Sequence, residues 1–167
     1  MTATATVRKT AQTTGSGLPN SKRAAVAEAL SRVLADTYTL YLQTQNFHWN
    51  VTGPHFFALH GLFEQQYTEL AAAVDGIAER IRAIGHPAPG TYAEFARLSS
   101  IDQVTDVPSA EEMVRILAEG NEAIVRTLRD AITIAEEIGD NATVDLLVQR
   151  TQAHEKSAWM LRSTLQT

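Results

Sequence analysis

Apolar side chains recur at helical spacing along almost the whole chain after residue 20, and this repetition constrains the fold more than any other feature. Such spacing places apolar side chains on one face of an amphipathic α-helix. No segment shows the alternation that is typical of strands. The sequence therefore predicts an all-α protein with four long helices, in residues 21–50, 56–85, 109–138 and from about 140 onward. The predicted apolar faces include Leu30, Tyr38, Tyr41 and Leu42 in the first run and Leu147, Val148 and Trp159 in the last.

Turn-forming residues separate these runs. Val51-Thr52-Gly53-Pro54 breaks the first from the second, Gly85 ends the second, and Gly139 ends the third. Ser109-Ala-Glu-Glu112 predicts a capping box, and Asp140 or Asn141 caps the last helix. Residues 86–108 are rich in proline and hold one brief apolar piece at 92–98, which predicts a long crossover with a short helix. Two tight turns and a long middle crossover are the ferritin-like arrangement of the four-helix bundle. This architecture alone is equally compatible with an all-α interaction module that has no catalytic activity.

The N-terminal segment differs in charge from the rest of the chain. Residues 1–23 contain no acid and four cations, whereas the remaining residues hold 10 basic and 19 acidic side chains. The segment lacks an apolar period and ends in the breaker Gly15-Ser-Gly-Leu-Pro19. We therefore expect a flexible basic arm over residues 1–20 and one bundle domain over residues 21–167.

Composition excludes several classes of protein. The 167-residue chain has no cysteine, which removes thiol nucleophiles, disulfide scaffolds and Cys-ligated metals. The start MTATATVRKTAQTT has no apolar core of a secretory signal, and no run of roughly 18 apolar residues occurs. We therefore expect a cytoplasmic protein with no membrane partner.

Two pairs of potential metal ligands share one face of the second helix. His60 and Glu64 are four residues apart, as are Asp75 and Glu79. At about 100° per residue, all four positions fall within a sector of about 100°. Aromatic residues around this face, namely Trp49, Phe56, Phe57, Phe63 and Tyr67, make bare carboxylates costly there unless they are paired or metal-bound. Taken singly, each of these residues is also common on the solvent-exposed surface of a helix.

These two pairs cannot bind one metal within a single chain. Their midpoints are 15 residues apart, which is roughly 22 Å along a helix. If two copies of the helix pack antiparallel about a two-fold axis, the His60/Glu64 end of one meets the Asp75/Glu79 end of the other, which gives two equivalent sites. His48 could supply a third ligand to the His60/Glu64 end. Two imidazoles and three carboxylates suit iron or manganese. The rival, an intrachain di-iron site, uses Glu-x-x-His pairs, and this sequence contains none.

The segment NFHWNVTGPHFFALH at 46–60, followed by DGIAERIRAIG at 75–85, resembles the Dps family of mini-ferritins, the DNA-binding proteins from starved cells. The likeness extends over the crossover to residues 154–161 in the last helix. It implies a hollow homododecamer of four-helix subunits, a ferroxidase that oxidises Fe²⁺ with hydrogen peroxide or O₂, stores ferric mineral and protects DNA. The resemblance places a two-iron site at the subunit two-fold, with His48, His60 and Glu64 from one subunit and Asp75 and Glu79 from its neighbour. Many relatives have Asp where this chain has Glu64.

The same resemblance implies roles for residues outside the ligand set. Asp140 and Asp145 match acidic positions that line an iron-admitting pore at a three-fold axis, although a helix N-cap and a solvated carboxylate explain them equally. Trp49, next to His48, is a near-site aromatic that could intercept stray oxidising equivalents. The other histidines, His55, His86 and His154, are expected to be surface or hydrogen-bonded residues.

DNA is the remaining candidate partner. An acidic shell repels DNA, so sequence-independent binding would fall to the arms, with Arg8, Lys9, Lys22 and Arg23 as candidate contacts. Because one particle would carry twelve arms, their individually weak contacts would together give high avidity for DNA. A solvated tail is the competing interpretation. The alternative function is a nucleoid-binding structural protein whose main role is DNA compaction.

Overall fold

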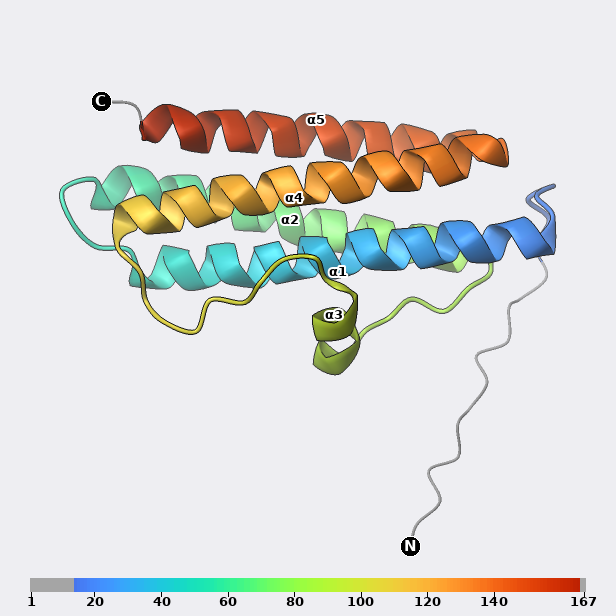
Figure 1. Ribbon diagram of the computed structural model, residues 1–167, viewed down its shortest axis with the longest axis horizontal. Helices are drawn as coiled ribbons and strands as arrows, with labels where there is room; N and C mark the ends of the chain where they lie inside the picture. Colours follow the sequence, from blue (N-terminus) through green and yellow to red (C-terminus); the bar gives the residue numbers. More distant parts are fainter. Residues whose placement is uncertain (1–13, 166–167) are drawn as a thin grey trace, which may run out of the picture.

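The computed structural model describes residues 14–165, which form four long helices and one short one (Figure 1). Within this range there is no strand, and no helix combines the length and apolarity that a membrane crossing needs. The predicted four-helix bundle with a short helix in its middle crossover is therefore confirmed. Its elements are α1 (Asn20–Asn50), α2 (Phe56–Ala83), α3 (Tyr92–Leu98), α4 (Ala110–Glu137) and α5 (Asn141–Thr164).

The long helices pack as two hairpins. α1 pairs with α2 and α4 pairs with α5, while α1 also packs against α4 and joins the two halves. The crossover runs along the outside of the bundle and carries α3, which rests on α1 (Figure 1). α2 and α5 touch only slightly, and a cavity lies between them.

Local signals end the helices where the sequence places them. Gly85 and Gly139 follow α2 and α4 with φ of 90° and 74°, a left-handed conformation that favours glycine. The Ser109 hydroxyl accepts the Glu112 backbone N–H at 3.3 Å and caps α4. The other half of the predicted capping box differs, because the Glu112 carboxylate pairs with Arg115 instead.

The core confirms most of the predicted apolar faces. Leu30, Leu147 and their neighbours on the four long helices are fully buried. Leu42, Val148 and Trp159 depart from that prediction, since they are 44%, 39% and 66% exposed. They lie at the margins of the apolar faces, where a helical stripe turns away from the bundle axis. The subunit therefore presents apolar side chains on its outer surface.

A buried carboxylate ties the crossover to the bundle. Asp36 of α1 is fully buried and accepts four hydrogen bonds. The donors are the Ser99 hydroxyl (3.0 Å), the Ser100 N–H and hydroxyl (2.5 and 2.9 Å) and the Thr127 hydroxyl of α4 (2.7 Å). Burying an ion costs free energy unless hydrogen bonds replace its water. Asp36 thus holds the end of α3, α1 and α4 in one arrangement.

We expect Asp36→Ala to lower the free energy of unfolding by about 2 kcal/mol, because four donors lose a charged acceptor. Asp130→Ala removes an exposed carboxylate from α4 and serves as the matched control, with an expected change below about 0.5 kcal/mol. Urea unfolding followed by circular dichroism measures both. Coincident curves for the two variants would contradict the stabilising role of Asp36.

Candidate metal centre

Two histidines meet where α1 is connected to α2. His48 lies in the last turns of α1 and is buried, and His60 lies near the start of α2 and is partly exposed. Their imidazole rings stack, with centroids 3.7 Å apart and 21° between the planes. Each Nδ1 lies 2.9 Å from the backbone carbonyl oxygen of the other histidine. The turn at Gly53 and Pro54 thus brings together two imidazoles from two helices.

This reciprocal hydrogen bonding decides which ring nitrogen is available to a metal. A carbonyl oxygen only accepts, so each Nδ1 carries the hydrogen and donates it. Nε2 of the neutral ring then keeps its lone pair, which is the form that binds metals. Within residues 14–165, no hydrogen bond occupies either Nε2. His48 and His60 are therefore oriented to present two nitrogen ligands.

Three carboxylates share α2 with His60. Glu64 lies one turn beyond His60, and Asp75 and Glu79 lie about three and four turns further along. All three side chains are at least partly exposed. In the described part of the chain, none of them forms an ion pair or a hydrogen bond. They are free to act as oxygen ligands.

One subunit does not gather these groups into a complete site. Among residues 14–165, no three His, Asp or Glu side chains lie close enough together to hold a metal ion. His48 and His60 are in contact, whereas Asp75 and Glu79 lie in the other half of the same helix, roughly 22 Å away by the rise of α2. A site that contains all five predicted ligands requires two copies of the chain.

Aromatic rings line the histidine pair. The Tyr67 ring meets His48 edge-on at 5.1 Å, and the Phe56 ring stacks on His60 at 5.0 Å. Trp49 is 64% exposed and makes no ring contact with either histidine within the described residues. Phe63, which we expected beside the polar face, is instead fully buried in the bundle core. The histidines therefore rest against an apolar wall formed by Tyr67 and Phe56.

The two predicted pore residues differ sharply in environment. Asp140 is 3% exposed, accepts the Thr143 N–H as the N-cap of α5, and pairs with Arg80 at 2.5 Å. Its carboxylate is therefore engaged inside the subunit, as an N-cap rather than as a free charge. Asp145 is exposed and accepts only a hydrogen bond from Gln149 at 2.8 Å. Of the two, Asp145 is the one available to an approaching cation.

The candidate DNA contacts also include both a buried, hydrogen-bonded residue and an exposed one. Arg8 and Lys9 lie outside the described residues, and Lys22 is exposed. Arg23 is 1% exposed, and its guanidinium donates 2.8 Å hydrogen bonds to the Ile84 carbonyl and the Thr14 hydroxyl. Arg23 thus joins the start of α1 to the end of α2, a structural position that does not suit contact with DNA.

Among the described residues, none of the three remaining histidines belongs to a cluster of potential metal ligands. His55 is exposed, and His86 is half-buried, where burial followed by the charge of Arg23 lowers its pKa. Nδ1 of the buried His154 donates to Asn121 at 2.9 Å, and its Nε2 faces the Arg150 guanidinium at 3.3 Å. Both ring nitrogens of His154 are engaged, as expected for a hydrogen-bonded histidine.

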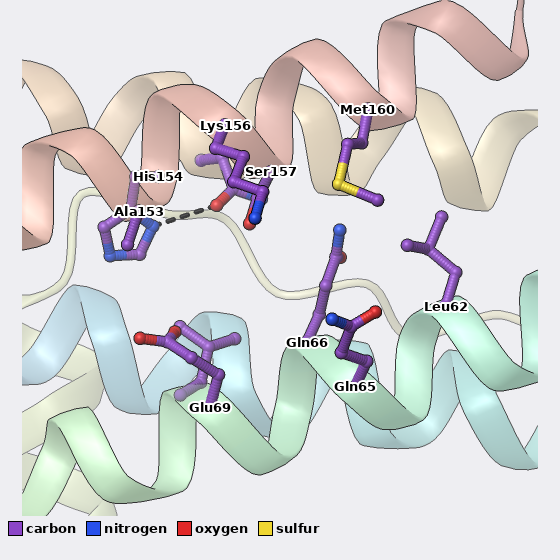
Figure 2. A pocket seen from close by; sticks show the side chains of 11 residues that line it. Leu62, Gln65, Gln66, Glu69, Ala153, His154, Lys156, Ser157 and Met160 are labelled. Carbon is purple, nitrogen blue, oxygen red and sulfur yellow. Dashed lines mark hydrogen bonds between the residues drawn. The ribbon is translucent and has the colours of Figure 1, made fainter.

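His154 borders a cavity of about 160 Å³ between α2 and α5 (Figure 2). Gln66 of α2 and Met160 of α5 point into it from opposite sides. Glu69 pairs with Arg150 through both carboxylate oxygens and keeps that cation beside His154. Burial, followed by the Arg150 charge, lowers the pKa of His154 from its ordinary 6.5 to about 3. The sequence pattern did not point to this Glu69–Arg150–His154 network, because its members come from two helices that are distant in sequence.

Comparison with known proteins gives the class and then the family. The family model described as the ferritin-like domain matches residues 27–167. Among solved structures, a Dps protein from Vibrio cholerae superposes with a TM-score of 0.88 at 30% identity, covering 94% of this chain and 99% of that one. The bundle described above is therefore a ferritin-like four-helix bundle.

Sequence relatives narrow this class. A DNA protection during starvation protein of Bacillus anthracis is 41% identical over 140 residues, covering 84% of this chain and 96% of the relative. The crystal structure of a Dps protein from Bacillus brevis is 39% identical with a TM-score of 0.85, covering 87% of this chain and 98% of that one. The chain belongs to the Dps family.

Proposed function

We propose that this protein is a ferroxidase that oxidises Fe²⁺ with hydrogen peroxide, or with O₂, and stores the ferric product inside a hollow homododecamer in the cytoplasm. The observation that carries the proposal is the stacked pair of His48 and His60, whose Nε2 atoms have no hydrogen-bond partner among the described residues. Two findings support it. The Bacillus anthracis relative is named for DNA protection, and the Vibrio cholerae Dps protein is a member of a broad superfamily of ferritin-like diiron-carboxylate proteins.

Each site would be completed across a two-fold axis. His48, His60 and Glu64 of one subunit would face Asp75 and Glu79 of a neighbour whose α2 runs antiparallel. Imidazole and carboxylate together suit iron, which is here the substrate and cargo. Two adjacent Fe²⁺ ions give one electron each to one peroxide, which takes up two protons and becomes two water molecules. Paired oxidation thus avoids the hydroxyl radical that a single Fe²⁺ would release.

The histidine pair contributes more than two nitrogen atoms. The bonds from Nδ1–H to the opposing carbonyls fix both ring orientations and the tautomer that leaves each Nε2 available to a metal. Tyr67 and Phe56 restrict water on one side of the rings, which strengthens the electrostatic interaction with a bound cation. The histidine pair is therefore organised before iron arrives.

Peroxide-dependent oxidation of Fe²⁺ by the purified protein tests this function directly. Light scattering tests the assembly, for which we expect about twelve times the subunit mass of 18.2 kDa. A stable monomer at micromolar concentration would contradict both the shell and the shared site.

We propose that Asp145 helps to attract Fe²⁺ toward the interior of the shell. Asp145→Asn should slow mineralisation, most strongly at low ionic strength, where the electrostatic field is least screened. Asp130→Asn removes an exposed carboxylate from α4 and is the matched control. Stopped-flow measurement of Fe³⁺ formation across a salt series gives the rates. Equal rates for both variants at every salt concentration would count against an entrance at Asp145.

DNA association is a second candidate, favoured by the basic composition of the first 20 residues and the name of the Bacillus anthracis relative. We propose that Arg8, Lys9 and the exposed Lys22 carry sequence-independent binding, which would place the particle on the nucleoid. Deleting residues 1–20 removes two of these three cations and should strongly reduce gel retardation of DNA without changing iron oxidation. Binding by the intact particle should fall steeply between about 50 and 200 mM salt. Undiminished retardation by the truncated particle would exclude the arm, and compaction without iron oxidation would favour the structural alternative.

A further inference from the structure

All four tyrosines of this protein lie in one continuous row that begins at the histidine pair. From His48 the ring centroids are 5.1 Å to Tyr67, 6.3 Å from Tyr67 to Tyr41, 5.8 Å from Tyr41 to Tyr38, and 6.3 Å from Tyr38 to Tyr92. Each separation lies in the range of direct aromatic contact. No tyrosine is left elsewhere in the chain.

The row crosses three helices and ends at the surface of the subunit. Tyr67 lies on α2, Tyr41 and Tyr38 lie one turn apart on α1, and Tyr92 begins α3. The first three rings are partly buried, whereas Tyr92 is 74% exposed. Tyr38 and Tyr92 border a surface hollow together with Phe95, whose ring stacks on Tyr38 at 4.6 Å. The row therefore joins the proposed iron site to a tyrosine that is exposed on the single subunit.

The hydroxyl groups distinguish this row from ordinary packing. Phenylalanine would fill the same positions without a polar atom to satisfy, yet every ring between His48 and the surface carries a phenol. Burial, followed by a hydrogen bond with Tyr92, raises the pKa of Tyr38, so this phenol keeps its proton at neutral pH. A neutral phenol is oxidised by losing an electron together with its proton.

We propose that Tyr67, Tyr41, Tyr38 and Tyr92 form a relay that carries a one-electron oxidising equivalent away from the iron site to the surface. The proposal rests on the proposed ferroxidase function. A site that holds a single Fe²⁺ gives one electron to hydrogen peroxide and releases Fe³⁺, hydroxide and a hydroxyl radical. Tyr67, in contact with His48, gives a hydrogen atom to this radical, which becomes water.

The remaining steps move the tyrosyl radical outward from ring to ring, and each step conserves atoms and electrons. Tyr41 reduces the Tyr67 radical, Tyr38 reduces that on Tyr41, and Tyr92 reduces that on Tyr38. In each step one electron passes between adjacent rings, one phenol loses its proton and the other regains one. The Tyr92 radical finally takes a hydrogen atom from a soluble reductant of the enediol or thiol class. The protein is restored and the oxidant is consumed away from the stored mineral.

Trp49 is the other oxidisable ring near the site, and the geometry favours the tyrosines. Trp49 is largely exposed and has no ring contact with His48, His60 or Tyr67 in the described part of the chain. The absence of cysteine removes the competing thiol donor from the protein itself. A radical detected on this protein can therefore be assigned to one of a few tyrosine and tryptophan residues.

The test identifies the residue that carries the radical, in addition to measuring iron oxidation. Assembled particles receive less than one Fe²⁺ per site without oxygen, then hydrogen peroxide in the presence of a nitroso spin trap, and peptide mass spectrometry locates the adducts. We expect adducts on Tyr92 in the unaltered protein. In Tyr41→Phe the Tyr92 adduct should be lost and the Tyr67 adduct retained. Trp159→Phe, an exposed ring on α5 outside the row, is the control and should keep the Tyr92 adduct.

The readouts separate failure of the relay from failure of the ferroxidase. Fe²⁺ oxidation at full iron loading should be the same in Tyr41→Phe and in the unaltered protein, because Tyr41 does not touch the ligands. A Tyr92 adduct that persists in Tyr41→Phe would overturn the relay, as would iron oxidation without any tyrosine adduct. Failure of the unaltered protein to oxidise iron would overturn the proposed function, and the relay with it.

Discussion

His60→Ala and Asp75→Ala should each abolish rapid oxidation of Fe²⁺ by hydrogen peroxide, and particles that contain both variants should recover part of the rate. The reason is the position of the two residues in different halves of α2, which would place them in different subunits of one site. A dimer with one subunit of each kind has one intact site and one doubly defective site. Random mixing therefore restores about a quarter of the sites. Each single variant should lose at least the roughly 10- to 100-fold that follows removal of an outer-shell partner of a metal ligand.

Controls separate the loss of a ligand from the loss of a fold. His55→Ala removes an exposed histidine just before α2, and Asp130→Ala removes an exposed carboxylate from α4. Both should retain the full rate. Native mass spectrometry confirms that subunits have mixed, and light scattering confirms particle size. Mixed particles that show no recovery would place the complete site within one subunit and contradict the shared arrangement.

Acid should destabilise the subunit through His154. The folded protein holds the pKa of this buried ring at about 3, whereas the unfolded chain takes up the proton near pH 6.5. Between these values the unfolded state binds more protons, so the free energy of unfolding falls as the pH falls, by about 1.4 kcal/mol per unit. Between pH 6.5 and 5, where most carboxylates of the unfolded chain stay ionised, we expect a loss of about 2 kcal/mol from His154.

His154→Gln isolates this contribution. A glutamine amide can donate to Asn121 and accept from Arg150, as the imidazole does, but it does not titrate. The variant should lose most of the dependence of its unfolding free energy on pH between 6.5 and 5, whatever its stability at pH 7, and the smaller part that remains comes from His86, whose pKa is also lowered. His55→Gln, at an exposed position, should keep the slope of the unaltered protein. Urea unfolding of metal-free protein supplies the values, and an unchanged slope in His154→Gln would disprove the assignment.

The sequence predicted the helices well because their signals are local. Gly85 and Gly139 end α2 and α4 through their own backbone conformation, and Ser109 caps α4 through a residue three positions away. The shared face of His60 and Glu64 likewise follows from helical geometry alone. The family assignment from the His48 and His60 segment is confirmed by the relatives, while the ligand set itself stays a prediction.

Interactions between distant segments lay beyond sequence reasoning. The sequence places Arg23 among the cations near the basic arm, yet its guanidinium donates to the Ile84 carbonyl, 61 residues away. The sequence leaves Asp140 open between a pore residue and the N-cap of α5; the structure confirms the N-cap and adds a pairing with Arg80, 60 residues away, that helical spacing does not indicate. Tyr38 and Tyr41 were predicted as part of an apolar stripe, because periodicity indicates which face a residue occupies and not which rings of other helices meet it.

If the proposed ligand pairs in the two halves of α2 complete one site only between subunits, the rate of iron oxidation also depends on how many subunits have associated. A subunit fresh from synthesis carries only part of a site, so on the proposed arrangement its oxidising power appears only when two chains associate, and it rises with the square of subunit concentration while dimers are scarce. Ferric product would then form only where a compartment is being built to receive it. Dilution would act as an off switch that needs no inhibitor.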